Sequence, residues 1–216
     1  MDHAVSENVY VGNAMNRRLF YQYGVLLSRS PFGHVDQSIS KNTAAGTTGL
    51  ISPSRIISKP IEQITIDGIE MEFQNTPGIE APAEMTTWIR QFKTFWAAEN
   101  ITGTIYNIYT LRGALIRNPL EWSKKINETL FSYGSKADVI FAFHNWPHWG
   151  NARIQEVMRA QRDAYAHLNN NVLHLANKGV TINEIHNVYT LPLSRDQPLF
   201  GILGCQPHNT DTAFAV

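Results

Sequence analysis

The chain has 216 residues, and 43% of them are hydrophobic, which is enough to bury the core of one large domain or of one and a half. Its 18 basic and 18 acidic side chains cancel. This balance argues against a nucleic-acid partner, because nucleic-acid-binding proteins usually carry a basic surplus or stripe. Cys205 is the single cysteine, which excludes a disulfide framework and a cysteine-rich zinc site. Any metal would therefore be held by histidine and carboxylate side chains.

The sequence shows no targeting or membrane-spanning segment. Residues 1–10 are polar and do not resemble a signal peptide. No apolar run approaches the roughly 18 residues that a membrane span needs. The compartment therefore stays open.

The first sixty residues are rich in glycine, proline and serine, which predicts loops with one short helix over residues 14–23. A β-hairpin is expected next. Residues 64–66 and 69–73 alternate apolar and polar side chains, and Asp67 and Gly68 stand between them. Alternation around an Asp-Gly pair is the strongest short-range signal of a hairpin.

The segment 85–98 has an ambiguous period. Trp88, Phe92, Phe95 and Trp96 fit one face of a helix. Aromatic richness and short apolar runs fit two strands equally well. The pattern alone leaves both structures open.

A helix is expected to begin at Asn118-Pro119, because asparagine is a good N-cap and proline is favoured at the first helical position. Gly134 is placed to end it. A buried strand follows over residues 137–143. Strand, helix and strand in this order predict an α/β layer architecture. The expected apolar face of the helix consists of Trp122, Ile126, Leu130 and Phe131.

Residues 151–177 are helical in composition, which suggests a boundary near Gly150 between an α/β part and an all-helical part. Thr181 and Glu184 have the spacing of a capping box for another short helix. The buried face of the long helix is predicted to contain Ile154, Val157, Met158, Gln161, Tyr165 and Leu168.

Three residues stand out as candidate functional residues, although each also has an ordinary structural explanation. Glu80 lies in the loop over residues 74–82, where charged residues are commonly solvated, but scaffolded loops also carry sites. Glu99 follows an apolar stretch, so its carboxylate either reaches water or needs a cation or hydrogen-bond donors. His144 ends the expected buried strand, a common position for functional groups in α/β folds and also for hydrogen-bonded structural histidines.

Two further residues could bind an anion. Arg112 has the planar guanidinium that matches oxyanions, and Asn107 offers an amide donor in the same loop. A solvated surface arginine is the competing explanation. His144 and His148 have the spacing of a two-histidine metal site on a helix, but Pro147 makes a helix there improbable.

Several multi-residue motifs together resemble the linear alkyl-sulfatases of the metallo-β-lactamase superfamily. The similarity runs from about residue 8 to about residue 190. The motifs are Gly12-Asn-Ala-Met-Asn-Arg-Arg18, Pro77-Gly-Ile-Glu-Ala-Pro-Ala-Glu-Met85, Ala98-Glu-Asn100, Asn107-Ile-Tyr-Thr-Leu-Arg-Gly-Ala114 and His144-Asn-Trp-Pro-His-Trp-Gly-Asn151, followed by the stretch from Gln161-Arg-Asp163 to Leu175-Ala-Asn177.

This resemblance implies an α/β fold: part of a metallo-β-lactamase αββα sandwich over residues 1–147, and the start of a helical dimerisation domain over residues 148–216. The ambiguous segment 85–98 would then form strands. The family hydrolyses linear primary alkyl sulfate esters, such as dodecyl sulfate, to alcohol and sulfate. The implied partners are an alkyl sulfate substrate and a second copy of the chain in a homodimer.

The resemblance also assigns roles to residues. Two zinc ions would be held in part by Glu80, Glu99 and His144, while Asn107 and Arg112 would hold the sulfate group. Zinc ions so placed would activate a water, and a general acid must protonate the leaving alcohol. His208 is the candidate acid, although the match fades from Cys205 onward.

The family's His-x-His-x-Asp-His motif is absent from this sequence, and so is the family's carrier-like C-terminal domain. We therefore expect a truncated copy with an incomplete metal shell that is inactive alone. Two other functions stay open: a non-catalytic dimerising remnant, and another hydrolase of the metallo-β-lactamase fold. Tyr106 and Asn145 also stand where the family usually has histidine. Neither difference is expected to affect a ligand.

Overall fold

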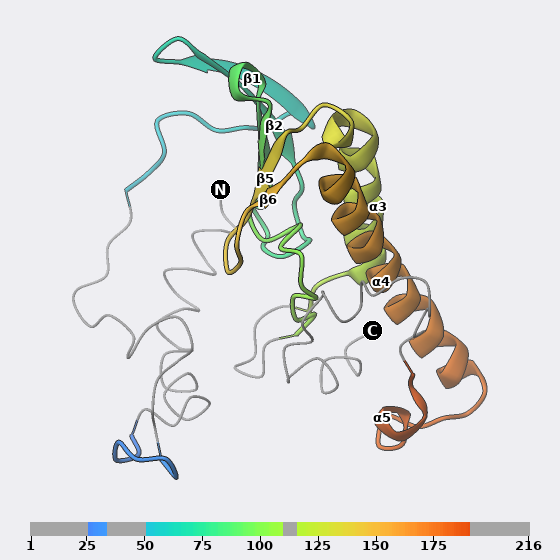
Figure 1. The fold of residues 1–216 in the computed structure, drawn as a ribbon. Coiled ribbons are helices and arrows are strands. Elements are labelled where there is room, and N and C mark those ends of the chain that lie inside the picture. The colour runs from blue at the N-terminus through green and yellow to red at the C-terminus, as the bar shows by residue number, and fades with distance from the viewer. Residues whose placement is uncertain (1–25, 34–50, 110–115, 191–216) are drawn as a thin grey trace. The chain divides into compact units, whose positions relative to one another are not determined.

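The structure is a computed structural model that describes residues 26–33, 51–109 and 116–190 (Figure 1). The chain divides into two compact units, one formed by residues 1–56 and 110–115 and the other by residues 57–109 and 116–216. The described residues of the first unit form turns and bends. All helices and strands described below belong to the second. The helix expected over residues 14–23, Arg112 and His208 lie outside the described residues.

The second unit contains a mixed six-stranded sheet whose strands lie in chain order. Neighbouring strands are antiparallel, except that β4 and β5 are parallel. The strands are β1 (Ile61–Ile66), β2 (Ile69–Asn75), β3 (Met85–Ile89), β4 (Thr94–Trp96), β5 (Val139–Phe141) and β6 (His148–Trp149). With the helices described below, this sheet confirms the predicted α/β fold class.

The predicted hairpin is present as β1 and β2. Ile66 pairs with Ile69, so Asp67 and Gly68 alone form the turn. Both turn residues have positive φ angles, 49° and 79°, as a type I′ turn requires. The Asp-Gly pair therefore fixes the register that places alternate side chains on one face of the sheet.

The segment 85–98 contains two strands, β3 and β4, joined by a single 3₁₀ turn over Arg90–Phe92. Trp88 pairs with Phe95 across these strands. Both rings stack on Tyr133, with centroid distances of 5.8 Å and 5.3 Å. Of the four aromatic residues with helix-like spacing, only Trp88 and Phe95 share this face, because Phe92 is 60% exposed and Trp96 follows Phe95 directly in its strand.

Helix α3 (Pro119–Thr129) begins as predicted, because the Asn118 side chain accepts a hydrogen bond from the backbone N–H of Glu121 at 3.1 Å. The helix continues as a π-helical turn, η3 (Leu130–Gly134). Trp122, Ile126 and Leu130 are buried as expected, but the prediction for Phe131 is wrong, since it is 77% exposed. Phe131 follows Leu130 directly, so the helical period turns it about 100° away from the buried stripe.

Helix α3 also connects the parallel strands β4 and β5, which is the predicted strand–helix–strand unit. Strand β5 is shorter than predicted and ends at Phe141. Residues beyond Phe141 are thereby released from the sheet, and they include His144.

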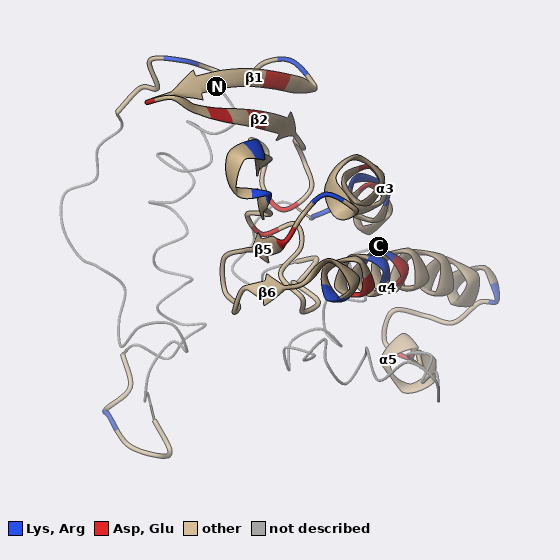
Figure 2. Cartoon of the chain, turned by 45° about the horizontal axis from the view of Figure 1, so that its top comes forward, with Lys and Arg blue, Asp and Glu red and all other residues tan. Residues whose placement is uncertain are grey.

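Helix α4 (Asn151–Asn177) has the predicted bounds and lies beside α3 (Figures 1 and 2). The six residues predicted for its buried face are all buried. Tyr165 stacks on Trp122 with a centroid distance of 4.4 Å, which joins the two helices at the centre of the core. Charges of both signs are interspersed over α3 and α4 in Figure 2.

The chain then turns into the short helix α5 (Ile185–Val188). Glu184 accepts hydrogen bonds from the backbone N–H and the hydroxyl of Thr181, at 3.1 Å and 2.6 Å, which is one half of the expected capping box. The N-cap of α5 is Glu184 itself, and its side chain makes no capping hydrogen bond. Among the described residues, no helix combines the length and the apolar character that a membrane span requires.

Candidate metal and anion site

The loops that carry the candidate residues leave the sheet at the same edge. Strands β4 and β5 are parallel, so the residues after Trp96 and after Phe141 emerge together. Strand β2 ends, and its antiparallel neighbour β3 begins, at that edge as well. The topology therefore brings together residues 76–84, the residues following β4 and the residues following β5.

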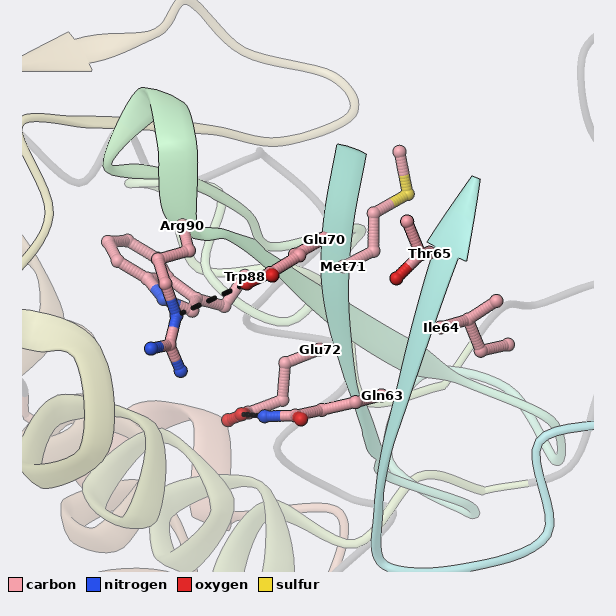
Figure 3. Close-up of a pocket in the computed structure, with 8 residues that line it drawn as sticks. All are labelled: Gln63, Ile64, Thr65, Glu70, Met71, Glu72, Trp88 and Arg90. Atoms are coloured by element: carbon pink, nitrogen blue, oxygen red, sulfur yellow. Dashed lines mark hydrogen bonds and ion pairs between the residues drawn. The ribbon is translucent and has the colours of Figure 1, made fainter. Parts of the chain in front are cut away.

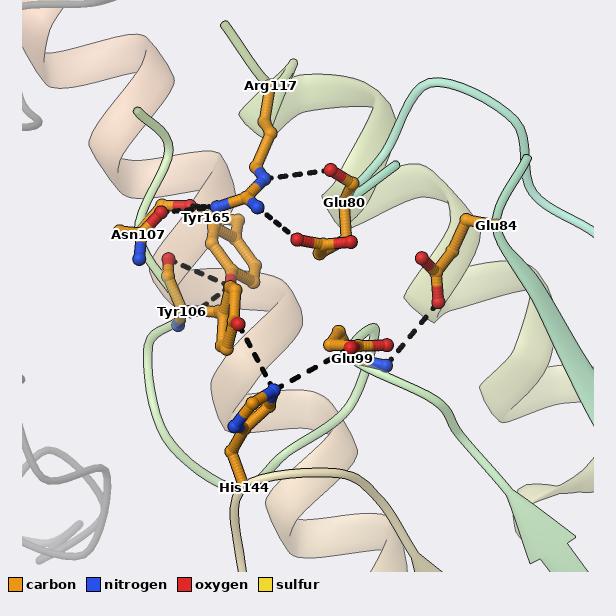
Figure 4. Close-up of polar contacts among 8 residues, drawn as sticks. All are labelled: Glu80, Glu84, Glu99, Tyr106, Asn107, Arg117, His144 and Tyr165. Atoms are coloured by element: carbon orange, nitrogen blue, oxygen red, sulfur yellow. Dashed lines mark hydrogen bonds and ion pairs between the residues drawn. The ribbon is translucent and has the colours of Figure 1, made fainter. Parts of the chain in front are cut away.

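Three carboxylates meet at this edge: Glu80, Glu84 and Glu99 (Figure 4). One carboxylate oxygen from each lies within 4.8 Å of the other two. Glu84 is buried, and it accepts a hydrogen bond from the backbone N–H of Glu99 at 3.4 Å. Like charges at this separation repel strongly unless a proton or a cation lies between them.

His144 lies beside this group. Its Nε2 atom is 3.6 Å from a carboxylate oxygen of Glu99 and 3.2 Å from the hydroxyl of Tyr106. Glu99 and His144 each stand three residues beyond the end of their strand, β4 or β5. Equal loop lengths on two parallel neighbours explain why the two side chains meet.

The backbone on both sides of this contact adopts an unusual conformation. Ala98 and His144 have positive φ angles of 47° and 64°, which is uncommon for residues other than glycine. The backbone N–H of Phe143 donates to the carbonyl of Ala98 at 2.9 Å and ties the two loops together. Such strain persists where the surrounding structure fixes the backbone, and it clusters at functional sites.

Arg117 joins the cluster of three carboxylates to the loop that contains Asn107 (Figure 4). Its Nε donates to the backbone carbonyl of Glu80 at 2.8 Å, and its Nη2 forms an ion pair with the Glu80 carboxylate. Its Nη1 donates to the backbone carbonyl of Asn107 at 2.7 Å and also to the side-chain oxygen of Asn107. The ring of Tyr106 lies 5.1 Å from the guanidinium carbon.

The carboxylates shift one another's protonation. Burial, together with the charges of Glu99 and Glu80, raises the pKa of Glu84 to about 8. Burial and the charge of Glu80 also raise the pKa of Glu99, although His144 and Arg117 oppose this shift. At neutral pH the cluster of three carboxylates, without a metal, therefore holds a proton that a bound cation would replace.

The donor set fits a divalent cation such as zinc. Carboxylate oxygens and an imidazole nitrogen are zinc ligands, and the chain can supply both within one group. Among the described residues, Glu80, Glu84 and Glu99 are the one set of three potential ligands that lie this close together.

His148 takes no part in this group. It lies on β6, and its Nε2 atom occupies the space that a side chain at Gly103 would need, 2.4 Å from where a Cβ atom would stand. Burial and the charge of Arg153 lower its pKa. The strand conformation of His148 agrees with the prediction that the two histidines do not form a helical metal site.

The structure thus brings together four of the six predicted site residues: Glu80, Glu99, His144 and Asn107. Arg112 and His208 lie outside the described residues. Sequence reasoning missed Glu84 and Arg117, although Glu84 belongs to the same motif as Glu80. Tyr106 was expected to have no effect on a ligand, whereas its hydroxyl contacts His144.

A separate pocket of about 220 Å³ lies over β1, β2 and β3 (Figure 3). Its two acidic residues are engaged: Glu70 pairs with Arg90 at 3.9 Å, and Glu72 accepts hydrogen bonds from Gln63 and Tyr133. Burial raises the pKa of Glu72, but these hydrogen bonds outweigh it and lower the pKa overall. The pocket therefore presents no group poised for chemistry.

Comparison with known proteins identifies relatives along most of the chain. No family model matches it. The chain is 46% identical to a linear primary-alkylsulfatase from Pseudomonas sp. over 89% of its own length and 28% of the relative's. It is 41% identical to an alkyl/aryl-sulfatase from Saccharomyces cerevisiae over 99% of its own length and 33% of the relative's.

Solved structures agree with this result. A stereoselective inverting sec-alkylsulfatase from Pseudomonas sp. overlays on the whole chain with a TM-score of 0.87 and 39% sequence identity, over 34% of that protein. The present chain spans about a third of the length of these relatives. Sequence and structure together show that the chain is a homologue of the alkylsulfatases.

Proposed function

We propose that this chain carries part of the catalytic centre of a zinc-dependent alkylsulfatase that hydrolyses linear primary alkyl sulfate esters of the dodecyl sulfate type. The observation that carries the proposal is the meeting of Glu80, Glu84, Glu99 and His144 at one edge of the sheet. These residues lie within the region that is homologous to alkylsulfatases. Three carboxylates crowded beside an imidazole, one of them buried and two half-buried, are costly to fold, and a metal-binding role accounts for them.

In this proposal Glu80, Glu99 and His144 hold zinc, and Glu84 lies close enough to join them. Zinc, when bound, supplies positive charge that neutralises the carboxylates and Lewis-acid activation of the reacting groups. The carboxylates orient the cation, and zinc bound at Nε2 of His144 would take the place of the contact that this atom makes with the Tyr106 hydroxyl. The hydrogen bond from the backbone N–H of Phe143 to the carbonyl of Ala98 keeps both loops in place.

Asn107 would bind the sulfate head through its amide N–H groups, and Arg112 would add a bidentate guanidinium. Sulfate carries negative charge in the substrate and gains more as the ester bond breaks, so such donors stabilise the transition state. His208 is proposed as the acid that protonates the leaving alcohol.

Three broader features also belong to the proposal. Residues 1–147 would form part of a metallo-β-lactamase sandwich, and residues 148–216 would begin a helical dimerisation domain that pairs two copies of the chain. No nucleic-acid partner is expected. The zero net charge and the mixed charges on α3 and α4 support the last point.

Grafting this chain in place of the matching segment of the 46% identical Pseudomonas relative tests the proposed activity. The graft should release sulfate from dodecyl sulfate, and a graft with Glu99→Ala should lose that activity because a ligand is gone. Glu121→Ala, a change on the exposed surface of α3, serves as the matched control. Full activity of the Glu99→Ala graft would refute the proposal.

The 216-residue chain alone should show no turnover of dodecyl sulfate. Its described residues supply three carboxylates and one imidazole at this edge, too few to complete the shells of two zinc ions. Sulfate release by the purified chain, measured by ion chromatography, would contradict the expected division of the site.

A further inference from the structure

Arg117 is the most completely bonded charged side chain of the site. It is 8% exposed, and all three of its guanidinium nitrogens donate hydrogen bonds. Its acceptors come from two loops, those of Glu80 and of Asn107 (Figure 4). A buried guanidinium is costly, so this arrangement is retained only if its bonds are well made.

We propose that Arg117 is the positioning residue of this site, which fixes the Glu80 carboxylate for a metal ion and turns the Asn107 amide so that its NH₂ group serves an anion. This inference rests on the proposed function, since it assigns Glu80 to a metal and Asn107 to the sulfate head. It extends that function to a residue outside the proposed ligands.

The orientation of Asn107 follows from hydrogen-bond chemistry. A guanidinium can only donate hydrogen bonds, so the atom of the Asn107 amide that contacts Arg117 must be its oxygen. The NH₂ group then lies on the other branch of the amide. Asn107 is thereby held with its NH₂ group directed away from the Arg117 guanidinium, where it can bind an oxyanion.

The position of Glu80 follows from two bonds to one residue. Arg117 binds both the backbone carbonyl and one carboxylate oxygen of Glu80, which fixes the loop and the side-chain rotamer together. The ion pair involves Oε1, which leaves Oε2 to face a cation. Carboxylates that ligate metals are usually hydrogen-bonded in this way, and losing such a partner commonly costs about 10- to 100-fold in metal affinity.

Lysine could not replace this residue. Its ammonium is a single point charge, whereas the planar guanidinium reaches acceptors in several directions at once. Tyr106 packs against the guanidinium at 5.1 Å and restricts it further. Arg117→Lys therefore keeps the charge but loses the geometry, which makes it the informative variant.

The test compares Arg117→Lys with the unchanged chain and with Arg162→Lys. Arg162 is a matched control because it also donates to an asparagine side-chain oxygen, that of Asn127 at 2.9 Å, but joins α3 and α4 away from the site. Circular dichroism and thermal unfolding establish that each protein is folded. Calorimetric titration then measures zinc affinity, and sulfate affinity of the zinc-loaded proteins.

A third measurement needs no metal. The side-chain amide resonances of Asn107, assigned by their disappearance in Asn107→Asp, report the orientation of the amide by NMR. Arg117→Lys should shift these resonances, weaken zinc binding by about 10- to 100-fold and weaken sulfate binding. Arg162→Lys should leave all three unchanged.

The outcomes separate this inference from the proposed function. If neither the unchanged chain nor Arg117→Lys binds zinc, but the Asn107 resonances shift in Arg117→Lys alone, the metal site is refuted and the positioning of the amide stands. If a folded Arg117→Lys keeps its zinc and sulfate affinities and its Asn107 resonances, Arg117 is not a positioning residue. Lower thermal stability without these changes would likewise mean that Arg117 only supports the fold.

Discussion

Replacing Glu84 by glutamine is expected to stabilise the metal-free chain at pH 8 by a few kcal/mol. Burial and the neighbouring carboxylates raise the pKa of Glu84 from 4.5 to about 8. Above pH 4.5 the unfolded chain releases this proton while the folded chain retains it, so the folded state loses stability as pH rises toward 8. Glutamine is neutral throughout and does not incur this loss.

Urea unfolding at pH 5 and at pH 8, with a chelator present, measures the effect. Glu84→Gln should unfold at a higher urea concentration than the unchanged chain at pH 8, with a much smaller difference at pH 5. Some pH dependence should remain, because the pKa of Glu99 is also raised. Glu121→Gln controls for a surface carboxylate. Equal pH dependence in Glu84→Gln and the unchanged chain would show that Glu84 is not forced to hold its proton.

Replacing Trp122 by alanine is expected to cost about 3–5 kcal/mol of unfolding free energy. Trp122 is fully buried, stacks on Tyr165 of α4, and donates a hydrogen bond from its indole N–H to the carbonyl of Asn100 at 2.8 Å. The substitution opens a cavity and leaves that carbonyl with only the longer hydrogen bond from the Gln161 side chain, at 3.4 Å. Because Asn100 follows Glu99, the loss should also loosen the metal loop.

Trp146→Ala is the matched control, because Trp146 is 83% exposed and removal of its side chain leaves no cavity. Chemical unfolding of both variants gives the comparison. A loss for Trp122→Ala no larger than that for Trp146→Ala would mean that the contact between α3 and α4 does not support the core.

The fold was largely predictable from local signals. Three signals each depend on residues that are close in the sequence, and each was located correctly. They are the Asp67-Gly68 turn, the Asn118-Pro119 start of α3 and the apolar spacing of α4. Phe131 was misplaced because it follows Leu130 directly, so even a regular α-helix turns it about 100° away from the stripe of Trp122, Ile126 and Leu130.

The site was predictable in part, and there is a physical reason why the sequence did not indicate the remaining site residues. The resemblance to alkyl-sulfatases indicated Glu80, Glu99, His144 and Asn107, and the structure places them together. Arg117 was missed because an arginine just before a helix is ordinarily solvated. Its role depends on contacts across 37 residues to Glu80, which no local pattern encodes.

The central claim is that Glu80, Glu99 and His144 hold a divalent cation, and zinc titration of the purified chain by calorimetry near neutral pH tests it most directly. The unchanged chain should bind zinc weakly but saturably, and Glu99→Ala should abolish this binding while Glu121→Ala preserves it. No zinc binding by the unchanged chain, or equal binding by a folded Glu99→Ala variant, would contradict the assignment.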